Sequence, residues 1–371
     1  MSDALFAVPG RLDLATGGYE YARRLLAELA PGKAVPALAH WPLPQLGIAP
    51  GDEALRETAR RLALGPVGWP VLMDGLALGV LPTEVLRAAQ GPVVALVHHP
   101  LALEHGLAPS DAERLFESEK RALAAVAAVV TTSEHTGSTL TADYGVAPSW
   151  ISVARPGIPR PRIVRPAAEP APDTAPRLLS IGTLIPRKGH DVLLRALATH
   201  RALPWTLQII GDPTRDEACA AALEQLVRDL GLAERVTFEG VTARDGVTAA
   251  YAAADLFVLA SRHEGYGMAY AEAMAAGLPV VGCDAGAVAE ATGGGACLVP
   301  PDDVDALATA LAPLLESPAA RLELAARGHA ATSALNDWPD TAALVAAALK
   351  PFLPASPANR EASAPSNQAT Q

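Results

Sequence analysis

The sequence predicts a protein of the α/β class with two domains, each built around a doubly wound parallel sheet. The chain has 371 residues, whereas a single hydrophobic core usually stops growing near about 250–300 residues. Short apolar segments also alternate in two successive series with stretches of helical periodicity, which is typical of parallel strands covered by helices on both faces. Ligands of such sheets bind beyond the carboxyl ends of the strands, so we expect the chemistry in loops that face a cleft between the domains.

The first series of strands and helices ends near residue 155. Its expected strands are LFAVPG, PVVALVHH, AVVTTS and WISVARPG, and its clearest helices are YEYARRLLAELA and ERLFESEKRALAAVAA. The next segment is rich in proline and has almost no hydrophobic periodicity, which is typical of a linker. We therefore assign residues 1–160 to the first domain and residues 161–176 to the linker.

The second series begins after the linker. Its expected strands are RLLSIGT, TLQIIGD, VTFEG, LFVLAS and LPVVGCD, with helices between them. We assign residues 177–337 to the second domain and residues 338–353 to a last helix. Residues 354–371 contain mostly Pro, Ala, Ser, Asn and Gln, which are too poor in large apolar groups to offset the entropy lost on ordering. We expect a disordered tail.

Composition argues against several classes of protein. The net charge of −11 disfavours a nucleic-acid-binding protein, which usually presents a basic face. No apolar run approaches the ~18 residues of a membrane span, and the start MSDALFAVPGRLD has neither a basic leader nor a cleavage site. The three scattered cysteines are too few for a disulfide framework or a zinc site. We expect a soluble, cytoplasmic protein.

Charge is distributed unevenly along the chain. Up to residue 165 there are 15 basic and 16 acidic residues, and beyond it 14 and 24. A nearly neutral first half tolerates an anionic or lipid-linked partner better than an acidic second half. Four arginines, Arg155, Arg160, Arg162 and Arg165, form either a solvated linker or a docking patch, which leaves open a weak peripheral contact with a membrane.

The segment SRHEGYGMAYAEAMAAGLPVVGCD carries the strongest chemical signal. It combines a strand end, a loop, a helix from about Met268 and a further strand. Gly265 and Gly267 let the backbone approach a ligand, and the free amides at the helix start can bind phosphate or sugar oxygens. Glu264 and Glu272 each offer two acceptors to neighbouring hydroxyls of a sugar or a ribose. Either glutamate alone could instead simply favour the helix start through its dipole.

The segment SIGTLIPRKGHDVLLRAL carries the second signal. A strand that ends at Gly182 leads through a short turn to Lys188 and then into a helix. Lys188 places a positive charge where negative charge can develop on a ligand, and such stabilisation contributes several kcal/mol in enzymes. Arg187, immediately before it, is either a second cation of the same site or an ordinary surface charge.

Two weaker signals lie in the first half. The segment DLATGGYEYARRLLAELA places Gly17 and Gly18 before an amphipathic helix, a pattern that most often marks a simple turn. The strand PVVALVHHP ends in His98 and His99, where a cleft residue is expected, although an isolated histidine is more often structural.

The segment from Glu264 to Glu272, with its glycines and the GLPVV strand, resembles the E-x7-E signature of family 4 glycosyltransferases, which are retaining enzymes of the GT-B fold. The resemblance covers most of residues 5–350 and is specific from about Leu178 to Glu290. It implies that Glu264 contacts the donor sugar and that Glu272 binds the nucleotide ribose. It also implies that backbone amides at the helix start contact the sugar and phosphates, at Tyr266, Gly267, Met268 and Ala269.

The same resemblance implies roles for the glycines and cations. Lys188 and an arginine shortly after the strand glycine would stabilise the leaving nucleotide diphosphate in place of a bound metal. Thr183 occupies that arginine position and offers only a hydroxyl, so Arg187 or an arginine from elsewhere would substitute. Gly17 and Gly18 would approach the donor diphosphate from across the cleft.

The resemblance further implies that the first domain lies on the acceptor side. His98 would contact the donor sugar, and His99 would help to shape the acceptor side. The segment DAGAVAE, with Gly286 and Glu290, resembles the loop after the signature, and VTFEG matches a strand whose end helps to hold the nucleobase; both also fit an ordinary turn and strand. The helix at residues 338–353 would cross back onto the first domain.

We therefore expect a retaining glycosyltransferase of the hexosyltransferase type that uses a nucleotide diphosphate sugar and needs no cofactor or metal. The acceptor stays open and is a glycan, a lipid-linked molecule or a small molecule. Two alternatives are a nucleotide-sugar epimerase of the same fold and, because of Thr183, a catalytically weak nucleotide-sugar-binding module. A dehydrogenase is disfavoured because no G-x-G-x-x-G follows the first strand of either series. Metal catalysis is also disfavoured, because no Asp-x-Asp stands at a strand end that faces the cleft.

Overall fold

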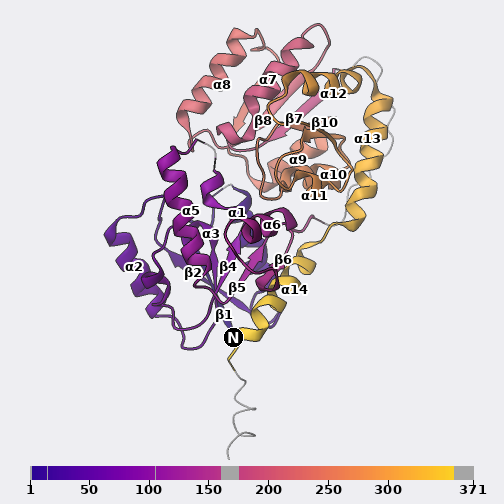
Figure 1. Cartoon of the computed structure of the whole chain (residues 1–371). Helices are drawn as coiled ribbons and strands as arrows, with labels where there is room; N and C mark the ends of the chain where they lie inside the picture. Colours follow the sequence, from indigo (N-terminus) through magenta and orange to yellow (C-terminus); the bar gives the residue numbers. More distant parts are fainter. Residues whose placement is uncertain (1, 15, 105, 160–174, 355–371) are drawn as a thin grey trace, which may run out of the picture.

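The computed structural model describes residues 2–14, 16–104, 106–159 and 175–354. Within these ranges the chain forms two parallel six-stranded sheets with helices on both faces (Figure 1), which confirms the predicted fold class. No helix of the described ranges is both long and apolar enough to cross a membrane. Most of the predicted linker, with Arg160, Arg162 and Arg165, and nearly all of the predicted tail lie outside the described residues.

The first sheet has the strand order β2-β1-β3-β4-β5-β6. Its strands are β1 (Ala4–Pro9), β2 (Leu38–Leu43), β3 (Val71–Asp74), β4 (Val93–Val97), β5 (Ala128–Thr131) and β6 (Ile151–Val153). Its helices are α1 (Gly17–Glu28), α2 (Asp52–Ala63), α3 (Gly75–Leu78), α4 (Thr83–Leu86), α5 (Pro109–Leu123) and α6 (Glu134–Ala142), with the 3-10 helices η1 (Leu101–Leu103) and η2 (Pro148–Trp150). The sequence patterns do not predict β2 and β3. Strand β2 is interrupted by a polar residue and a proline, and β3 has only four residues.

The second sheet has the order β12-β11-β10-β7-β8-β9. Its strands are β7 (Arg177–Ile181), β8 (Thr206–Ile210), β9 (Val236–Gly240), β10 (Leu256–Leu259), β11 (Val280–Cys283) and β12 (Cys297–Val299). Its helices are η3 (Pro186–Lys188), α7 (His190–Thr199), α8 (Glu217–Asp229), α9 (Arg244–Ala253), α10 (Met268–Ala275), α11 (Val288–Thr292), α12 (Val304–Glu316), α13 (Pro318–Ala331) and η4 (Thr332–Ala334). The sequence analysis does not include the three-residue strand β12.

Each sheet separates two apolar layers. Successive side chains of a strand point to opposite faces. In β1, Leu5 and Ala7 therefore join one buried cluster, while Ala4, Phe6 and Val8 join another. The second sheet likewise has one cluster on each face. Because both faces are apolar, helices must cover both.

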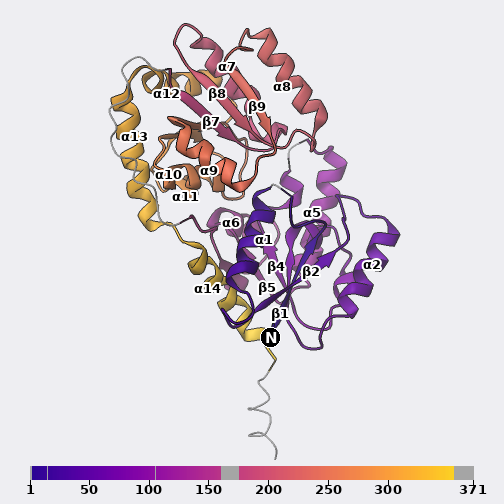
Figure 2. The same ribbon diagram turned by 180° about the vertical axis from the view of Figure 1, so that it is seen from behind.

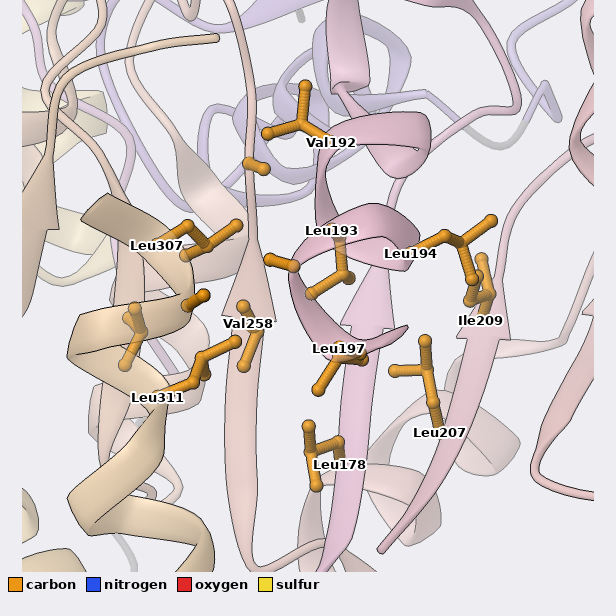
Figure 3. Close-up of a cluster of buried hydrophobic side chains, with 14 of the residues drawn as sticks. Leu178, Val192, Leu193, Leu194, Leu197, Leu207, Ile209, Val258, Leu307 and Leu311 are labelled. Atoms are coloured by element: carbon orange, nitrogen blue, oxygen red, sulfur yellow. The ribbon is translucent and has the colours of Figure 1, made fainter. Parts of the chain in front are cut away.

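The core of the second domain fixes the strand ends from which the site loops leave. Figure 3 shows Leu193 and Leu197 of α7 beside Leu178 of β7 and Val258 of β10, and these side chains are almost completely buried. Truncation of such a side chain, as in Leu193→Ala, usually costs about 2–5 kcal/mol of stability. The ends of β7 and β10 are thus held firmly relative to each other.

The last helix, α14 (Trp338–Leu349), packs against the first domain (Figures 1 and 2) and is followed by η5 (Lys350–Phe352). The side chain of Asp337 caps its first turn, in a capping box with Asp340. The Trp338 ring meets the Tyr21 ring edge-on at 5.6 Å between centroids. Val345 is fully buried in the same first-domain cluster. The helix therefore joins the two halves of the chain, while the domain boundaries stay predictions.

Helix α1 begins earlier than the sequence suggested. Gly17 and Gly18 are its first two residues and not a turn before it. A Cβ atom on Gly18 would lie 3.5 Å from the His98 ring, and one on Gly17 would lie 3.7 Å from Sδ of Met268 in the second domain. The start of α1 thus lies beside residues of both domains.

Candidate active site between the two domains

Strand β10 is followed by a loop that carries Glu264 to the start of α10. Ser261 of this loop donates a hydrogen bond from Oγ to Oε1 of Glu264 at 2.6 Å. A Cβ atom on Gly265 would lie 2.3 Å from the carbonyl oxygen of His98, and one on Gly286 would lie 2.3 Å from the carbonyl oxygen of Glu264. Both distances are far below any real contact. Glycine at these positions therefore allows the loop to pack against the first domain and against its neighbouring loop.

Two cations hold the Glu264 carboxylate. Lys188 Nζ lies 2.5 Å from Oε1, and Arg187 Nη1 lies 3.4 Å from Oε2. Both residues belong to η3, the turn after β7. Gly189 follows with a φ of 62°, and a Cβ atom there would lie 1.9 Å from the carbonyl oxygen of Ala260. Glycine therefore lets this turn pack against the end of β10 and brings both cations to Glu264.

Burial and charge act in opposite directions on Glu264. Burial alone would raise its pKa, but the charges of Lys188 and Arg187 outweigh burial and lower the pKa to about 2. Burial lowers the pKa of Lys188, and the charge of Glu264 opposes that effect. At neutral pH Glu264 is therefore an ionised carboxylate that accepts hydrogen bonds and donates none.

Arg187 also connects the two domains. Its Nε donates to Oε1 of Glu104, which follows η1 of the first domain, at 2.8 Å. Its Nη1 donates to the carbonyl oxygen of His263 at 2.9 Å. The other carboxylate oxygen of Glu104 lies 3.2 Å from His99 Nε2. Burial would raise the pKa of Glu104, but His99 and Arg187 hold it well below its ordinary value.

Glu272 takes part in a second contact between the two domains. Arg244 Nη1 lies 3.2 Å from Oε1 of Glu272 and 3.1 Å from Oε1 of Glu20, which belongs to α1 of the first domain. The Tyr251 hydroxyl lies 3.3 Å from Oε2 of Glu272 and 3.2 Å from the carbonyl oxygen of Ala269. Burial raises the pKa of Glu272, although Arg244 opposes this rise.

His98 directly follows β4, and one of its ring nitrogens makes no hydrogen bond with the described residues. Its ring meets the Tyr21 ring edge-on at 5.2 Å between centroids. Its Nε2 is 3.7 Å from Oδ2 of Asp74, which is too far for a hydrogen bond. Within the described ranges this buried nitrogen has no hydrogen-bond partner. A ligand could supply one.

The start of α10 meets the first domain through the side chain of Met268. Gly267 precedes the helix with a φ of 103°, and Met268 packs against core clusters of both domains. The Tyr266 side chain is buried in the second-domain core, so only the backbone of Tyr266 is available to a ligand. Ala269 is the second residue of α10, where amides are free of helical partners. Thr183 is half-buried just after β7.

Glu290 of α11 joins the domains at a third place. Its carboxylate accepts hydrogen bonds from the backbone N–H groups of Glu134, at 2.9 Å, and His135, at 3.3 Å, at the start of α6. It also accepts one from Nε of Arg155. Acidic groups favour a helix start because of its free N–H groups and dipole. Arg155, the one arginine of the predicted patch within the described ranges, is thus engaged inside the protein.

The comparisons with known proteins point to glycosyl transfer. Residues 175–317 match the family model described as Glycosyl transferases group 1. The chain is 29% identical over 304 residues to the MMP alpha-(1->4)-mannosyltransferase of Mycolicibacterium hassiacum. The alignment covers 77% of this chain and 71% of that relative. It is 34% identical over 214 residues to the D-inositol 3-phosphate glycosyltransferase of Mycolicibacterium gilvum, in an alignment that covers 55% of this chain and 48% of that relative.

These comparisons support a family 4-like glycosyltransferase. The solved structure of HepE from Anabaena in complex with UDP-glucose covers 94% of this chain and 99% of its own at 21% identity, with a TM-score of 0.72. That likeness shows the GT-B fold. The relatives named here are glycosyltransferases, and none of them is an epimerase, so the comparisons support glycosyl transfer and give the epimerase alternative no support.

The structure of this glycosyltransferase brings most of the predicted site residues into two groups where the domains meet. Glu264, Lys188 and Arg187 touch one another, while His99 meets them through Glu104. A second group lies around the starts of α1 and α10, with Gly17, Gly18, His98, Met268 and Glu272. Thr183 lies between the end of β7 and the turn η3 that carries Lys188, but among the described residues no hydrogen bond joins its hydroxyl to either glutamate of the signature.

Several residues of the candidate site are not singled out by the sequence motifs. They are Glu20, Glu104, Arg244, Tyr251 and Ser261. Two of them carried a usable signal, because Ser261 follows β10 and Arg244 follows β9 in loops at the carboxyl ends of strands. Glu20 and Glu104 acquire their roles only when the domains face each other. Among the described residues, no group of three or more histidine, cysteine, aspartate or glutamate side chains is arranged to hold a metal ion.

Proposed function

We propose that this protein transfers a hexosyl group from a nucleotide diphosphate sugar to an acceptor hydroxyl with retention of the anomeric configuration. The observation that carries the proposal is the Glu264 carboxylate, held by Lys188 and Arg187 where loops of the two domains meet. This arrangement offers an acceptor for sugar hydroxyls beside fixed positive charge for a diphosphate. The name of the mannosyltransferase relative supports a hexose as the transferred group.

Lys188 and Arg187 would stabilise the leaving nucleotide diphosphate. When the bond between the anomeric carbon and the phosphate oxygen breaks, the bonding electrons leave with that oxygen and negative charge develops on the diphosphate. Both cations are already held by Glu264, so they need little reorganisation as the charge appears. Arg187 then serves in place of the arginine that Thr183 replaces. With these two cations the reaction would proceed without a metal, and undiminished activity in EDTA is the corresponding measurement.

Glu264 would position the sugar by accepting hydrogen bonds from its hydroxyls, and His98 Nε2 would contact the sugar from the first domain. A carboxylate paired with two cations is a weak nucleophile, which favours a front-face path over a covalent intermediate on Glu264. In this path the acceptor oxygen attacks from the face that the diphosphate leaves, and the departing phosphate oxygen accepts the acceptor proton. NMR of the product would show the donor's anomeric configuration; the opposite configuration would contradict this path.

The nucleotide would lie between the starts of α1 and α10. Glu272 would accept hydrogen bonds from ribose hydroxyls, and amides at Gly267, Met268 and Ala269 would bind phosphate and sugar oxygens. Gly17 and Gly18 would let the first domain approach the diphosphate closely. The nucleobase and the sugar are open, so a donor panel must include both uridine and guanosine nucleotides.

The protein would act in the cytoplasm, without a nucleic-acid partner. Its three cysteines, Cys219, Cys283 and Cys297, are free, which suits a reducing compartment. The acceptor would be a glycan, a lipid-linked molecule or a small molecule, and the name of the inositol 3-phosphate relative makes phosphorylated polyols worth including. Addition of anionic vesicles to the assay tests whether a weak peripheral membrane contact assists the reaction.

The deciding experiment measures nucleotide release from a panel of nucleotide sugars with and without acceptors. Release that depends on acceptor supports transfer, donor conversion without acceptor would indicate an epimerase, and binding without release would indicate a binding module. Glu264→Gln keeps the side-chain shape but removes its charge, so it should abolish turnover without changing the melting temperature by more than a few degrees. Glu53→Gln, on an exposed position of α2, is the matched control. Normal turnover by Glu264→Gln would refute the assignment.

A further inference from the structure

The nucleoside end of the donor site contains a side chain that touches carboxylates of both domains. Arg244 is the first residue of α9, and its Nη1 contacts Oε1 of Glu272 and Oε1 of Glu20 at nearly equal distances. Glu20 is anchored independently, because Arg23 holds its Oε2 at 2.8 Å and Arg24 holds its Oε1 at 2.9 Å. Arg244 therefore joins Glu272 to a fixed anion on the other side of the cleft.

Burial disfavours the charged form of Glu272. Its side chain is only 13% exposed, and burial raises its pKa. The groups that face it are Arg244 and Tyr251 of α9 and Glu20 of α1: Arg244 and the Tyr251 hydroxyl oppose the rise, whereas the like charge of Glu20 adds to it. Arg244 is thus the cation that favours the ionised form of Glu272.

We propose that Arg244 is a positioning residue that keeps Glu272 ionised and aimed at the ribose hydroxyls, and that it couples this end of the donor site to closure of the domains through Glu20. This inference rests on the proposed function, because it takes Glu272 as the ribose acceptor. An ionised carboxylate accepts hydrogen bonds at both oxygens, whereas a protonated one turns one oxygen into a donor. Without Arg244, Glu272 would remain buried beside Glu20 and would take up a proton at a higher pH.

The sign of the pH dependence follows. Ribose binding requires ionised Glu272, so affinity is present above the pKa of Glu272 and is lost as the pH falls through it. Arg244→Gln removes the opposing charge and raises the pKa of Glu272 further. The loss of affinity in this variant should therefore appear at a higher pH than in the wild-type protein, and raising the pH should restore part of it.

The experiment measures the Kd of UDP and GDP between pH 5.5 and 8.5 by calorimetry, using whichever nucleotide the wild-type chain binds. We expect Arg244→Gln to weaken binding about tenfold at pH 6, as expected for loss of a charge-assisted hydrogen bond, and much less at pH 8.5. Arg244→Lys keeps the charge and should restore most of the wild-type profile. The 2′,3′-dideoxy nucleotide lacks both ribose hydroxyls, so its Kd should not show the additional pH dependence.

Arg24→Gln is the matched control, because Arg24 pairs with the same Oε1 of Glu20, whereas the side chains that contact Glu272 are those of Arg244 and Tyr251. It should leave the pH profile of nucleotide binding unchanged. A loss of affinity in Arg244→Gln that is equal at every pH, or equal for the dideoxy nucleotide, would overturn the inference, as would no loss at all. If the wild-type chain in its native fold bound no nucleoside diphosphate of any base, the proposed function itself would fail, which is a separate outcome.

Discussion

The two ends of the proposed donor site share one arrangement but differ in charge. At the sugar end, Arg187 joins Glu264 of the second domain to Glu104 of the first. At the nucleoside end, Arg244 joins Glu272 to Glu20 in the same way. Lys188 gives the Glu264 carboxylate a second cation, and the pKa of Glu264 falls to about 2. At the nucleoside end, the pKa of Glu272 is raised.

This difference matches two kinds of chemistry. The Arg187 side chain is 13% exposed and the Arg244 side chain is 38% exposed, so charges interact more strongly at the sugar end. Negative charge develops on a leaving diphosphate, and two buried cations suit that task. Neutral ribose hydroxyls need only an ionised acceptor. Substitutions at the sugar end should therefore act mainly on kcat, and those at the nucleoside end mainly on nucleotide affinity.

The largest expected effect follows from Lys188→Met. Loss of one preorganised cation should lower kcat by about 10²–10³ while changing the donor KM much less. Lys188 also helps to lower the pKa of Glu264. In the variant that pKa should rise, so the residual activity should fall off at a higher pH on the acid side than wild-type activity does.

Steady-state kinetics across pH, with the melting temperature as a check of folding, test this prediction. Lys33→Met is the matched control, because Lys33 is exposed and donates only to the carbonyl oxygen of Ala27. A change confined to KM would show that Lys188 contributes to uniform binding and would remove the contrast between the two ends.

A smaller effect should follow from Arg187→Gln, since Lys188 remains on Glu264. We expect kcat to fall by about 10–100-fold, corresponding to one hydrogen-bonded charge lost from a largely buried site. The double variant Arg187→Gln with Thr183→Arg places an arginine at the position implied by the family resemblance. Partial recovery of kcat would show that Arg187 performs the task of the arginine that Thr183 replaces.

Single-turnover rates of the two variants are the appropriate measurement, with Arg195→Gln on the exposed side of α7 as the control. If Arg187→Gln left kcat unchanged, Arg187 would serve only the cross-domain contact with Glu104, and the two ends of the site would differ less than their charges suggest.

Much of the fold follows from local patterns in the sequence. Strands such as β4 and β10 are continuous apolar segments bounded by loops, so their periodicity identifies them directly. The missed strands carry weaker signals: β2 contains Pro42 and alternates with polar residues, and β12 has three residues. Such strands are stabilised by their neighbours in the sheet, and a single sequence does not reveal those neighbours.

The candidate site divides in the same way. Glu264, Lys188 and Glu272 lie in local motifs with a recognisable spacing, so the sequence identifies them. Glu104 lies 83 positions from Arg187, and Glu20 lies 224 positions from Arg244. Neither pair has a local pattern, because each forms only when two separately folded sheets face each other. The sequence therefore predicts the donor half of the site better than its contacts across the cleft.

The smallest expected effect on catalysis comes from Glu290→Gln, which separates domain closure from charge within the site. Glu290 also bridges the domains, and its partners are two N–H groups of α6 and the Arg155 side chain. Neither glutamate of the signature is among these partners. Its loss should lower the free energy of unfolding by about 1–3 kcal/mol, as for other hydrogen-bonded charged groups, and should lower kcat less than Arg187→Gln does.

Chemical denaturation and kinetics provide the two measurements, with Glu323→Gln on the exposed face of α13 as the control. If Glu290→Gln lowered kcat as much as Arg187→Gln, weakened closure would explain both variants, and the contrast between the two arginines would no longer require a difference in their charges.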